Sequence, residues 1–253
     1  MTMGVEGGAV AIVTGGSRGI GRQVAEQLLA KGWNVCITGR KQESLDEAVA
    51  EMAAGDRLLA VAGRAQDADH QRDVIGQLMQ RWGRIDGLVN NAATSPFLGD
   101  LVDASAEQIE RGFGTNFIAP WSWIKNVYDA YMREHGGSIV NVASIGGTYP
   151  VPRVGVYNVT KAAVIHMTKQ MGLEMAPKVR INAVAPATIK TDFAKAKYEG
   201  REQEVAAQYP LRRLGTPEEV AEAVVMLLDG KLGWMTGQTL ILDGGASLIQ
   251  GVR

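Results

Sequence analysis

Cysteine is nearly absent from this sequence: its 253 residues include only Cys36, so an intramolecular disulfide and a cysteine-cluster metal site are excluded. An excess of charge is also missing, because 26 Lys and Arg residues stand against 27 Asp and Glu residues, a net charge of −1. A chain without a broad positive field is not expected to attract nucleic acid or an anionic membrane surface. No apolar run reaches the roughly 18 residues that a membrane-spanning helix needs. We therefore expect neither nucleic acid nor a membrane as a partner, and no bound metal.

The N-terminal segment MTMGVEGG lacks the charged and apolar regions of a secretory signal. Thr2 stands where N-myristoylation would require glycine. These two absences predict a cytoplasmic protein.

Short β-branched runs alternate along the chain with longer stretches whose apolar residues recur at helical spacing. The predicted strands are Ala9–Thr14, Asn34–Thr38, Leu58–Ala62, Gly87–Asn90, Ser138–Val142, Arg180–Val184 and Thr239–Leu242. The predicted helices include Gly19–Lys31, Ser44–Ala54, Asp69–Trp82, Asn116–Met132, Tyr157–Met175 and Glu218–Leu228. Strands separated by helices form right-handed βαβ units, and uniformly apolar strands fit a parallel sheet covered on both faces. Because no repeat or composition shift marks a linker, we predict one α/β domain over residues 1–253.

A glycine-rich turn follows the first predicted strand and opens the first predicted helix. Its sequence is Thr14-Gly15-Gly16-Ser17-Arg18-Gly19-Ile20-Gly21. Glycines let the backbone approach a pyrophosphate closely, and the helix N-terminus offers free N–H groups to it. A plain strand–helix turn is the alternative, but this position in the chain favours a dinucleotide site.

The end of the second strand indicates which dinucleotide is bound. An NAD site usually has an acidic residue there, whereas this strand ends in Thr38-Gly39-Arg40. The guanidinium groups of Arg18 and Arg40 could converge on a 2′-phosphate, which they bind well. The alternative is two solvated surface arginines. We predict NADP(H) as the cofactor.

Tyr157 and Lys161 lie four residues apart in a predicted helix, so both project from one face. A neighbouring ammonium is expected to lower the pKa of a tyrosine from about 10. Tyr157 is thus a candidate general acid for a carbonyl oxygen that receives a hydride.

Taken together, the motifs resemble the short-chain dehydrogenase/reductase family. They are Thr14-Gly15-x3-Gly19-x-Gly21, Asn90-Asn91-Ala92-Ala93, Asn116, Ser144, Tyr157-x3-Lys161 and Asp243-Gly244-Gly245, in family order over residues 9–245. The resemblance implies a single-domain Rossmann fold, a doubly wound seven-stranded parallel sheet in the order 3-2-1-4-5-6-7.

The resemblance also implies roles for individual residues. Tyr157 exchanges the proton, Lys161 lowers its pKa and binds the nicotinamide ribose, and Ser144 hydrogen-bonds the substrate oxygen. Asn116, in the helix after the fourth strand, holds a water that links Lys161 to solvent. The implied cofactor-binding residues are Gly15, Ser17, Arg18, Gly19, Ile20, Gly21, Arg40, Asn91, Ala92, Tyr157, Lys161, Pro186, Ile189 and Thr191.

The sequence departs from the family pattern at three places. Ala93 and Ala187 stand where the family often has glycine, and Arg64 with Ala65 replaces an acidic and hydrophobic pair that commonly contacts adenine. Either Asp67 takes over that contact, or Arg64 stacks on the adenine.

Two tryptophans indicate an assembly. Trp121 and Trp123 cannot both face one side of the Asn116–Met132 helix, so this helix is predicted to be apolar on two faces. Such a helix meets a second subunit as well as its own sheet. The resemblance to the family likewise implies a homodimer or a homotetramer, formed through this helix and the Tyr157–Met175 helix.

The function predicted from these residues is NADPH-dependent interconversion of a ketone and a secondary alcohol, with a small-molecule substrate. The alternative within the family is a 3-oxoacyl-ACP reductase acting on an acyl thioester, for which Arg153, Arg212 and Arg213 could supply a docking patch. A lid over the substrate is expected from Thr191 to Leu211. A non-catalytic dinucleotide-binding regulator and a Ser144 hydrolase are less favoured, because the catalytic positions are all present and no G-x-S-x-G motif surrounds Ser144.

Overall fold

The computed structural model describes residues 8–249. Its centre is a parallel sheet with the strand order β3-β2-β1-β4-β5-β6-β7, which confirms the predicted order. The strands are β1 (Val10–Thr14), β2 (Asn34–Gly39), β3 (Leu58–Ala62), β4 (Gly87–Asn90), β5 (Gly137–Val142), β6 (Val179–Pro186) and β7 (Thr239–Leu242). All six neighbouring pairs are parallel.

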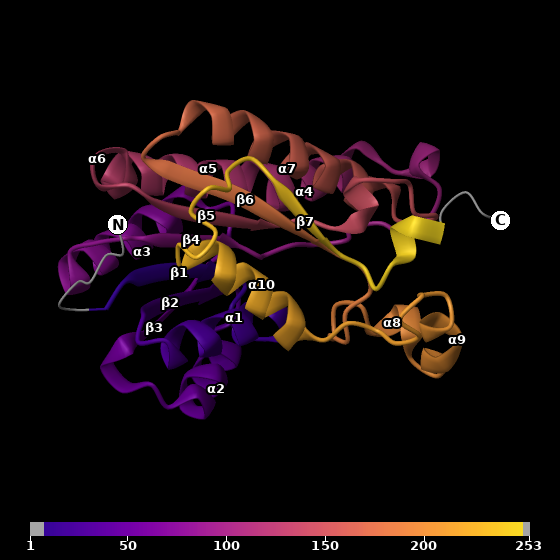
Figure 1. Cartoon of the computed structure of the whole chain (residues 1–253), viewed down its shortest axis with the longest axis horizontal. Coiled ribbons are helices and arrows are strands. Elements are labelled where there is room, and N and C mark those ends of the chain that lie inside the picture. The colour runs from indigo at the N-terminus through magenta and orange to yellow at the C-terminus, as the bar shows by residue number, and fades with distance from the viewer. Residues whose placement is uncertain (1–7, 250–253) are drawn as a thin grey trace.

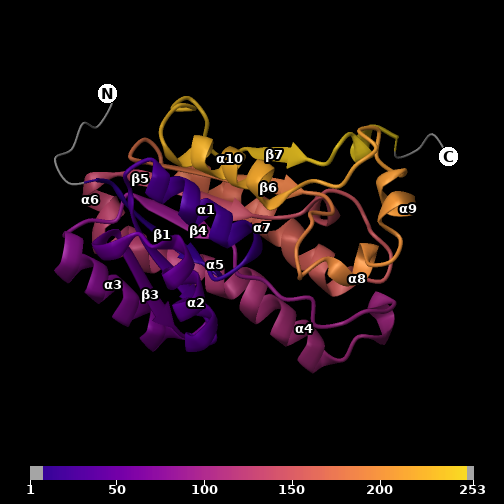
Figure 2. The same cartoon turned by 90° about the horizontal axis from the view of Figure 1, so that it is seen from below.

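Ten α-helices are found in the described part of the chain. They are α1 (Gly19–Ala30), α2 (Gln42–Met52), α3 (Ala68–Trp82), α4 (Ala106–Phe113), α5 (Ala119–Val127), α6 (Arg133–His135), α7 (Gly155–Glu174), α8 (Lys195–Tyr198), α9 (Glu202–Ala206) and α10 (Pro217–Leu228). In Figure 1, α1, α2 and α10 lie on one side of the sheet, and α4, α5 and α7 lie on the other. The short helices α8 and α9 project beyond one end of the sheet (Figures 1 and 2).

The apolar strands bury side chains on both faces of the sheet. Along β1, Ala11 and Val13 pack with residues of α1, α2 and α10, whereas Val10 and Ile12 pack with residues of α3, α5 and α7. Successive side chains of a strand point to opposite faces, so each face receives alternate residues of the same run. The two hydrophobic cores explain why these strands read as continuous apolar runs and confirm the doubly wound prediction.

Local signals set several helix boundaries. The Asp67 carboxylate accepts hydrogen bonds from the Asp69 and His70 amides at the start of α3. Helix α10 begins with a capping box between Thr216 and Glu219. Ala53, with φ of 46°, ends α2 two residues before the predicted boundary, because a left-handed residue cannot continue a right-handed helix.

The predicted Asn116–Met132 helix is part of a longer helical rod. Helices α4, α5 and α6 are joined by two π-helical turns, Gly114–Ile118 and Tyr128–Met132, with right-handed helical dihedrals at every junction. Pro120 has no amide hydrogen to donate, so the regular i→i−4 ladder is interrupted near the first turn. Because α4 is its first part, the rod begins at Ala106, ten residues before the predicted start.

None of the helices within residues 8–249 has both the length and the apolar character needed to cross a membrane.

Candidate active site

The glycine-rich turn between β1 and α1 is backed by the segment after β4. The Thr14 hydroxyl accepts hydrogen bonds from the Asn91 and Ala92 amides, at 3.0 and 3.1 Å. The Asn91 side-chain amide donates to the Thr14 and Gly15 carbonyls, at 2.9 and 3.1 Å. These contacts bring together Gly15, Asn91 and Ala92, three of the residues predicted to contact the cofactor.

Two of the glycines in this turn cannot be replaced without displacing the backbone. Gly15 has φ of 66°, which favours glycine, and a Cβ atom there would lie 3.1 Å from the Ala92 Cα. A Cβ atom on Gly21 would collide with the Asn91 amide and the Gly15 carbonyl. No side chain among the described residues caps the N-terminus of α1, whose N-cap residue is Arg18. Its first amides are thus available to an anion, as a pyrophosphate site requires.

Arg18 and Arg40 come from neighbouring segments at the same edge of the sheet. The Gly16 amide donates to the Thr38 carbonyl at 3.0 Å, which ties the glycine turn to β2 directly before Arg40. The side chains of both arginines are exposed to solvent. The Arg18 guanidinium lies 3.6 Å from the Asp192 carboxylate, an ion pair that the sequence did not indicate.

The loop after β3 is held by buried side chains. The Ala65 carbonyl accepts hydrogen bonds from Gln71 Nε2 at 2.7 Å and Trp123 Nε1 at 3.0 Å. The Asp67 carboxylate is occupied as the cap of α3, while Arg64 is exposed. The contact with adenine through Asp67 or Arg64 stays a prediction.

Ser144, Tyr157 and Lys161 meet at the carboxyl end of the sheet. Ser144 follows the end of β5, and the other two residues lie on the first two turns of α7. The Ser144 side chain lies close enough to the Tyr157 phenol to act on its pKa. The Lys161 Nζ atom lies 5.5 Å from the centre of the Tyr157 ring.

The electrostatics of this group correct one expectation. We expected Lys161 to lower the pKa of Tyr157, but burial raises the pKa of Tyr157 to about 12, and the hydrogen bond with Ser144 acts in the lowering direction. Burial lowers the pKa of Lys161 to about 8. The expectation from the sequence was wrong because it considered the positive charge of Lys161 but not the desolvation of the Tyr157 phenol.

Asn116 is fully buried in the first π-helical turn and braces the site. Its Oδ1 accepts from the Thr94 amide at 2.8 Å, and its Nδ2 donates to the Thr94 carbonyl at 2.8 Å and to the Thr160 hydroxyl at 2.9 Å. Thr160 directly precedes Lys161, so Asn116 connects the segment after β4 to α7. Its role in holding a water stays a prediction.

The segment after β6 crosses to the glycine turn and then passes over Tyr157. Pro186 ends β6, Ile189 is buried, and Thr191 lies 3.3 Å from where a Cβ atom of Gly19 would be. Ala187 shows no positive φ, so alanine fits where the family often has glycine. The Phe193 ring lies 5.9 Å from the Tyr157 ring and is 52% exposed. The aromatic side chain of the expected lid thus covers the candidate general acid.

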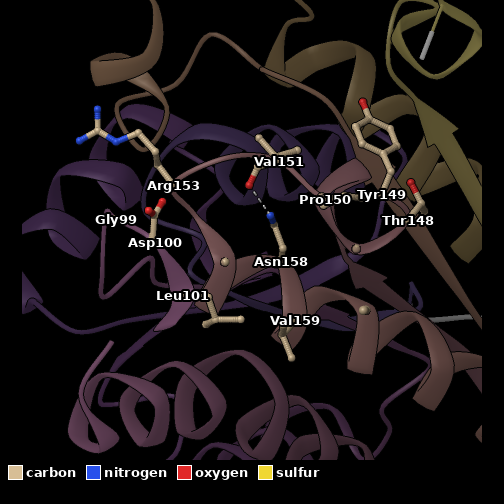
Figure 3. A pocket seen from close by; sticks show the side chains of 14 residues that line it. Gly99, Asp100, Leu101, Thr148, Tyr149, Pro150, Val151, Arg153, Asn158 and Val159 are labelled. Carbon is tan, nitrogen blue, oxygen red and sulfur yellow. Dashed lines mark hydrogen bonds between the residues drawn. The ribbon is translucent and has the colours of Figure 1, made fainter. Parts of the chain in front are cut away.

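The arginines considered for carrier-protein docking are partly engaged elsewhere. Arg213 pairs with Glu219, and Arg212 donates to the Ala207 carbonyl at 2.8 Å. Arg153 borders a pocket of about 480 Å³ between the β5–α7 loop and residues 99–101 (Figure 3). This pocket lies outside the catalytic group, because Ser144, Tyr157 and Lys161 do not line it.

Comparisons with known proteins place this chain in a family. A family profile described as enoyl-(acyl carrier protein) reductase matches residues 15–247. The rabbit (Oryctolagus cuniculus) protein named dehydrogenase/reductase SDR family member 4 is 37% identical over 241 residues, which cover 94% of this chain and 93% of the rabbit protein. A solved structure of ElxO with NADP bound has a TM-score of 0.88 and 30% identity, covering 95% of this chain and 99% of that one. A variant of actinorhodin polyketide ketoreductase with NADPH has a TM-score of 0.90 and 29% identity, covering 96% and 99%.

Proposed function

Because the chain belongs to the short-chain dehydrogenase/reductase family, we propose that it is an NADP(H)-dependent oxidoreductase that interconverts a ketone and a secondary alcohol. The observation that carries the proposal is the grouping of Ser144, Tyr157 and Lys161, with Ser144 beside the phenol and the Lys161 amine 5.5 Å from the centre of its ring. A proton donor, a hydrogen-bond donor and a cation at one point are what a developing alkoxide needs.

The residues at the glycine turn fit a phosphorylated dinucleotide. The uncapped N-terminus of α1 and the close backbone approach at Gly15 suit a pyrophosphate, and exposed Arg18 and Arg40 suit a 2′-phosphate. Similar structures with NADP or NADPH bound support the same choice. We also propose that the bound cofactor contacts Ser17, Ile20, Asn91, Ala92, Pro186, Ile189 and Thr191. NADPH, when bound, supplies the hydride.

The state of Tyr157 suits reduction. With a pKa of about 12, the phenol is protonated at neutral pH and can donate its proton to a carbonyl oxygen. As negative charge passes to the tyrosine oxygen, the Ser144 hydroxyl and the Lys161 ammonium stabilise it. Because the pKa of Lys161 is about 8, most of this side chain is still charged at pH 7. The resting site therefore holds the proton that ketone reduction consumes.

We also propose a cytoplasmic, single-domain protein that assembles as a homodimer or homotetramer. All seven strands, from residue 10 to residue 242, share one sheet, which supports a single domain. Ile118 and Trp121 on the rod and Val159 and Leu173 on α7 are large apolar side chains that are 42–78% exposed. Such faces commonly mark subunit interfaces.

A panel of ketones and acyl thioesters with NADPH, together with alcohols and NADP+, tests the proposal. We expect loss of NADPH absorbance with at least one small ketone, and none when Tyr157→Phe replaces the wild type. The thioester arm tests the alternative of a 3-oxoacyl-ACP reductase, which the description of the matching family profile motivates. No turnover of any class, with NADPH binding intact, would favour the non-catalytic regulator instead.

A further inference from the structure

The loop between β5 and α7 carries Ser144 and lies directly on α7. A Cβ atom on Gly147 would lie 2.7 Å from the Lys161 carbonyl carbon and 2.8 Å from the Ala162 amide nitrogen. The loop backbone therefore touches the helix backbone at this point. Glycine at position 147 is required by this approach, because any side chain would push the loop away.

Asn158, the residue after Tyr157, makes two further contacts with the same loop. Its Oδ1 atom lies against Gly146, where a Cβ atom would collide with it. Its Nδ2 atom donates a hydrogen bond to the Val151 carbonyl at 2.8 Å. One side chain thus fastens the loop at both ends, residue 146 and residue 151.

The Asn158 amide is held in this orientation although it leaves one polar atom without a partner. The side chain is 8% exposed, and its buried Oδ1 has no hydrogen-bond partner among the described residues. The reversed orientation would place oxygen against the Val151 carbonyl oxygen, so it offers no improvement. An unpaired buried acceptor destabilises a fold, and it calls for a reason in the site that keeps it.

On one side, the loop between β5 and α7 borders a pocket rather than a packed helix or strand. The pocket of about 480 Å³ is lined by Gly146, Gly147, Thr148, Tyr149, Pro150 and Val151 as well as by Asn158. In Figure 3, Asn158 rises from α7 toward Val151 across this pocket. Because the loop borders an open pocket here, the contacts that α7 provides contribute strongly to its position.

The position of Gly146 bears directly on the catalytic group. Its amide donates a hydrogen bond to the Ser144 Oγ atom at 3.2 Å, and the Ser144 side chain lies beside the Tyr157 phenol. A hydroxyl that accepts from an amide is polarised and has its own proton turned toward the next acceptor. A small shift of Gly146 would turn the Ser144 hydroxyl away from the reacting oxygen.

We propose that Asn158 is a positioning residue, which holds the Gly146 amide against the Ser144 hydroxyl and so orients that hydroxyl for catalysis. This inference rests on the proposed function, because it assumes that Ser144 assists the reduction. Asn158 itself touches neither Tyr157's hydroxyl nor the reacting atoms through any contact described above.

A double-mutant cycle tests the inference. The variants are Ser144→Ala, Asn158→Ala and both together, with Asp100→Ala as the control, since Asp100 is exposed and lines the same pocket. We measure kcat for a ketone from the panel, the dissociation constant of NADPH, and thermal unfolding. Asn158→Ala should lower kcat about 10- to 100-fold while NADPH affinity stays unchanged. In the Ser144→Ala background it should lower kcat no further, because it acts through Ser144. Asp100→Ala should retain wild-type kcat.

A second substitution keeps the test usable if Asn158→Ala does not fold. Asn158→Asp preserves the shape of the side chain but places an oxygen against the Val151 carbonyl, so kcat should fall in the same way. Wild-type kcat in a folded Asn158 variant overturns the inference. Additive losses in the double variant, or a fall in NADPH affinity parallel to kcat, also overturn it and leave Asn158 a structural residue. Full turnover in Ser144→Ala would instead refute the proposed role of Ser144.

Discussion

The Lys161 Nζ atom donates a hydrogen bond to the main-chain carbonyl of Val142, 2.7 Å away. Val142 is the last residue of β5 and Lys161 lies on the second turn of α7. The end of the sheet thereby fixes where the amine lies relative to Tyr157. Lys161 is only 3% exposed, so this hydrogen bond is almost completely shielded from water.

Burial of this amine gives the cofactor-free enzyme a pH-dependent stability. The pKa of Lys161 is about 8 in the folded chain and 10.5 ordinarily, so between these values the unfolded chain binds more protons. Wild-type stability should therefore rise with pH through this window. Lys161→Met removes the buried charge and should be more stable than the wild type at pH 7, by up to about 3 kcal/mol. Urea unfolding of both proteins from pH 7 to 10 should show the gap narrowing above pH 8; a constant gap would contradict the assignment.

Tyr157→Phe should abolish most turnover and leave the cofactor bound. The substitution removes the phenolic hydroxyl, which carries a proton at neutral pH, and leaves the ring in place. We expect kcat to fall by roughly 10²–10⁴-fold with NADPH affinity preserved, as measured by steady-state kinetics and fluorescence titration. Tyr131→Phe, at a tyrosine in the second π-helical turn, is the matched control. Near-normal turnover in Tyr157→Phe would reject Tyr157 as the general acid.

Arg40→Ala should weaken NADPH binding and spare NADH. A charge-assisted contact to the 2′-phosphate contributes about 1.5–3 kcal/mol, or roughly 10- to 150-fold in affinity. Titration of both cofactors measures the effect, with Lys31→Ala, at the C-terminal end of α1, as a control for net charge. An equal loss for NADPH and NADH would mean that Arg40 does not contact the phosphate, and a wild type that prefers NADH would reject the NADP(H) assignment itself.

Asp192 should compete with the cofactor for Arg18. The two side chains form an exposed ion pair at 3.6 Å, so binding of a 2′-phosphate by Arg18 has to loosen it. Asp192→Asn should strengthen NADPH binding by up to about fivefold, the range of a surface pair, and leave NADH unaffected. The gain should disappear at high salt, where exposed charges are screened. Glu202→Gln, which breaks the Lys190 pair in the same segment, is the control and should not change affinity.

The exposed apolar side chains of the rod and α7 predict an oligomer. Light scattering at micromolar concentration should report a dimer or a tetramer. Trp121→Glu with Val159→Glu places charges at two residues that are 42% and 44% exposed, and should shift the population toward monomers. A monomeric wild type would refute the proposed assembly. The apolar side chains of the rod and α7 would then be exposed to water in the native protein.

The sequence predicted the strands well because each one is a run of apolar residues buried on both faces. Ser144, Tyr157 and Lys161 lie near one another, as expected when a residue after a strand faces the start of the following helix, while their catalytic roles stay predictions. The beginning of the helical rod was missed. Its first helix, α4, is set by a capping box at Ser105 and Gln108 rather than by a long apolar stripe.

Other features depend on contacts between distant segments. The raised pKa of Tyr157 comes from the surroundings that exclude water, and these are assembled by folding. The pairing of Arg18 with Asp192 joins positions 174 residues apart, which no local pattern records. The contacts of Asn158 with its loop follow from a close backbone approach at Gly146 and Gly147, and the only local signal was the pair of glycines itself.

The place of β1 in the middle of the sheet also affects how the chain is made. As it leaves the ribosome, β1 can pair with β2, and β2 with β3, in order of synthesis. On its other side the Val10 amide has its partner in Asp86, 76 positions further along. At ~5–20 residues per second, that side of β1 stays open for about 4–15 s. An unpaired apolar strand edge can capture another nascent chain. The topology that centres the glycine turn therefore makes the growing polypeptide most vulnerable to aggregation before β4 has been translated.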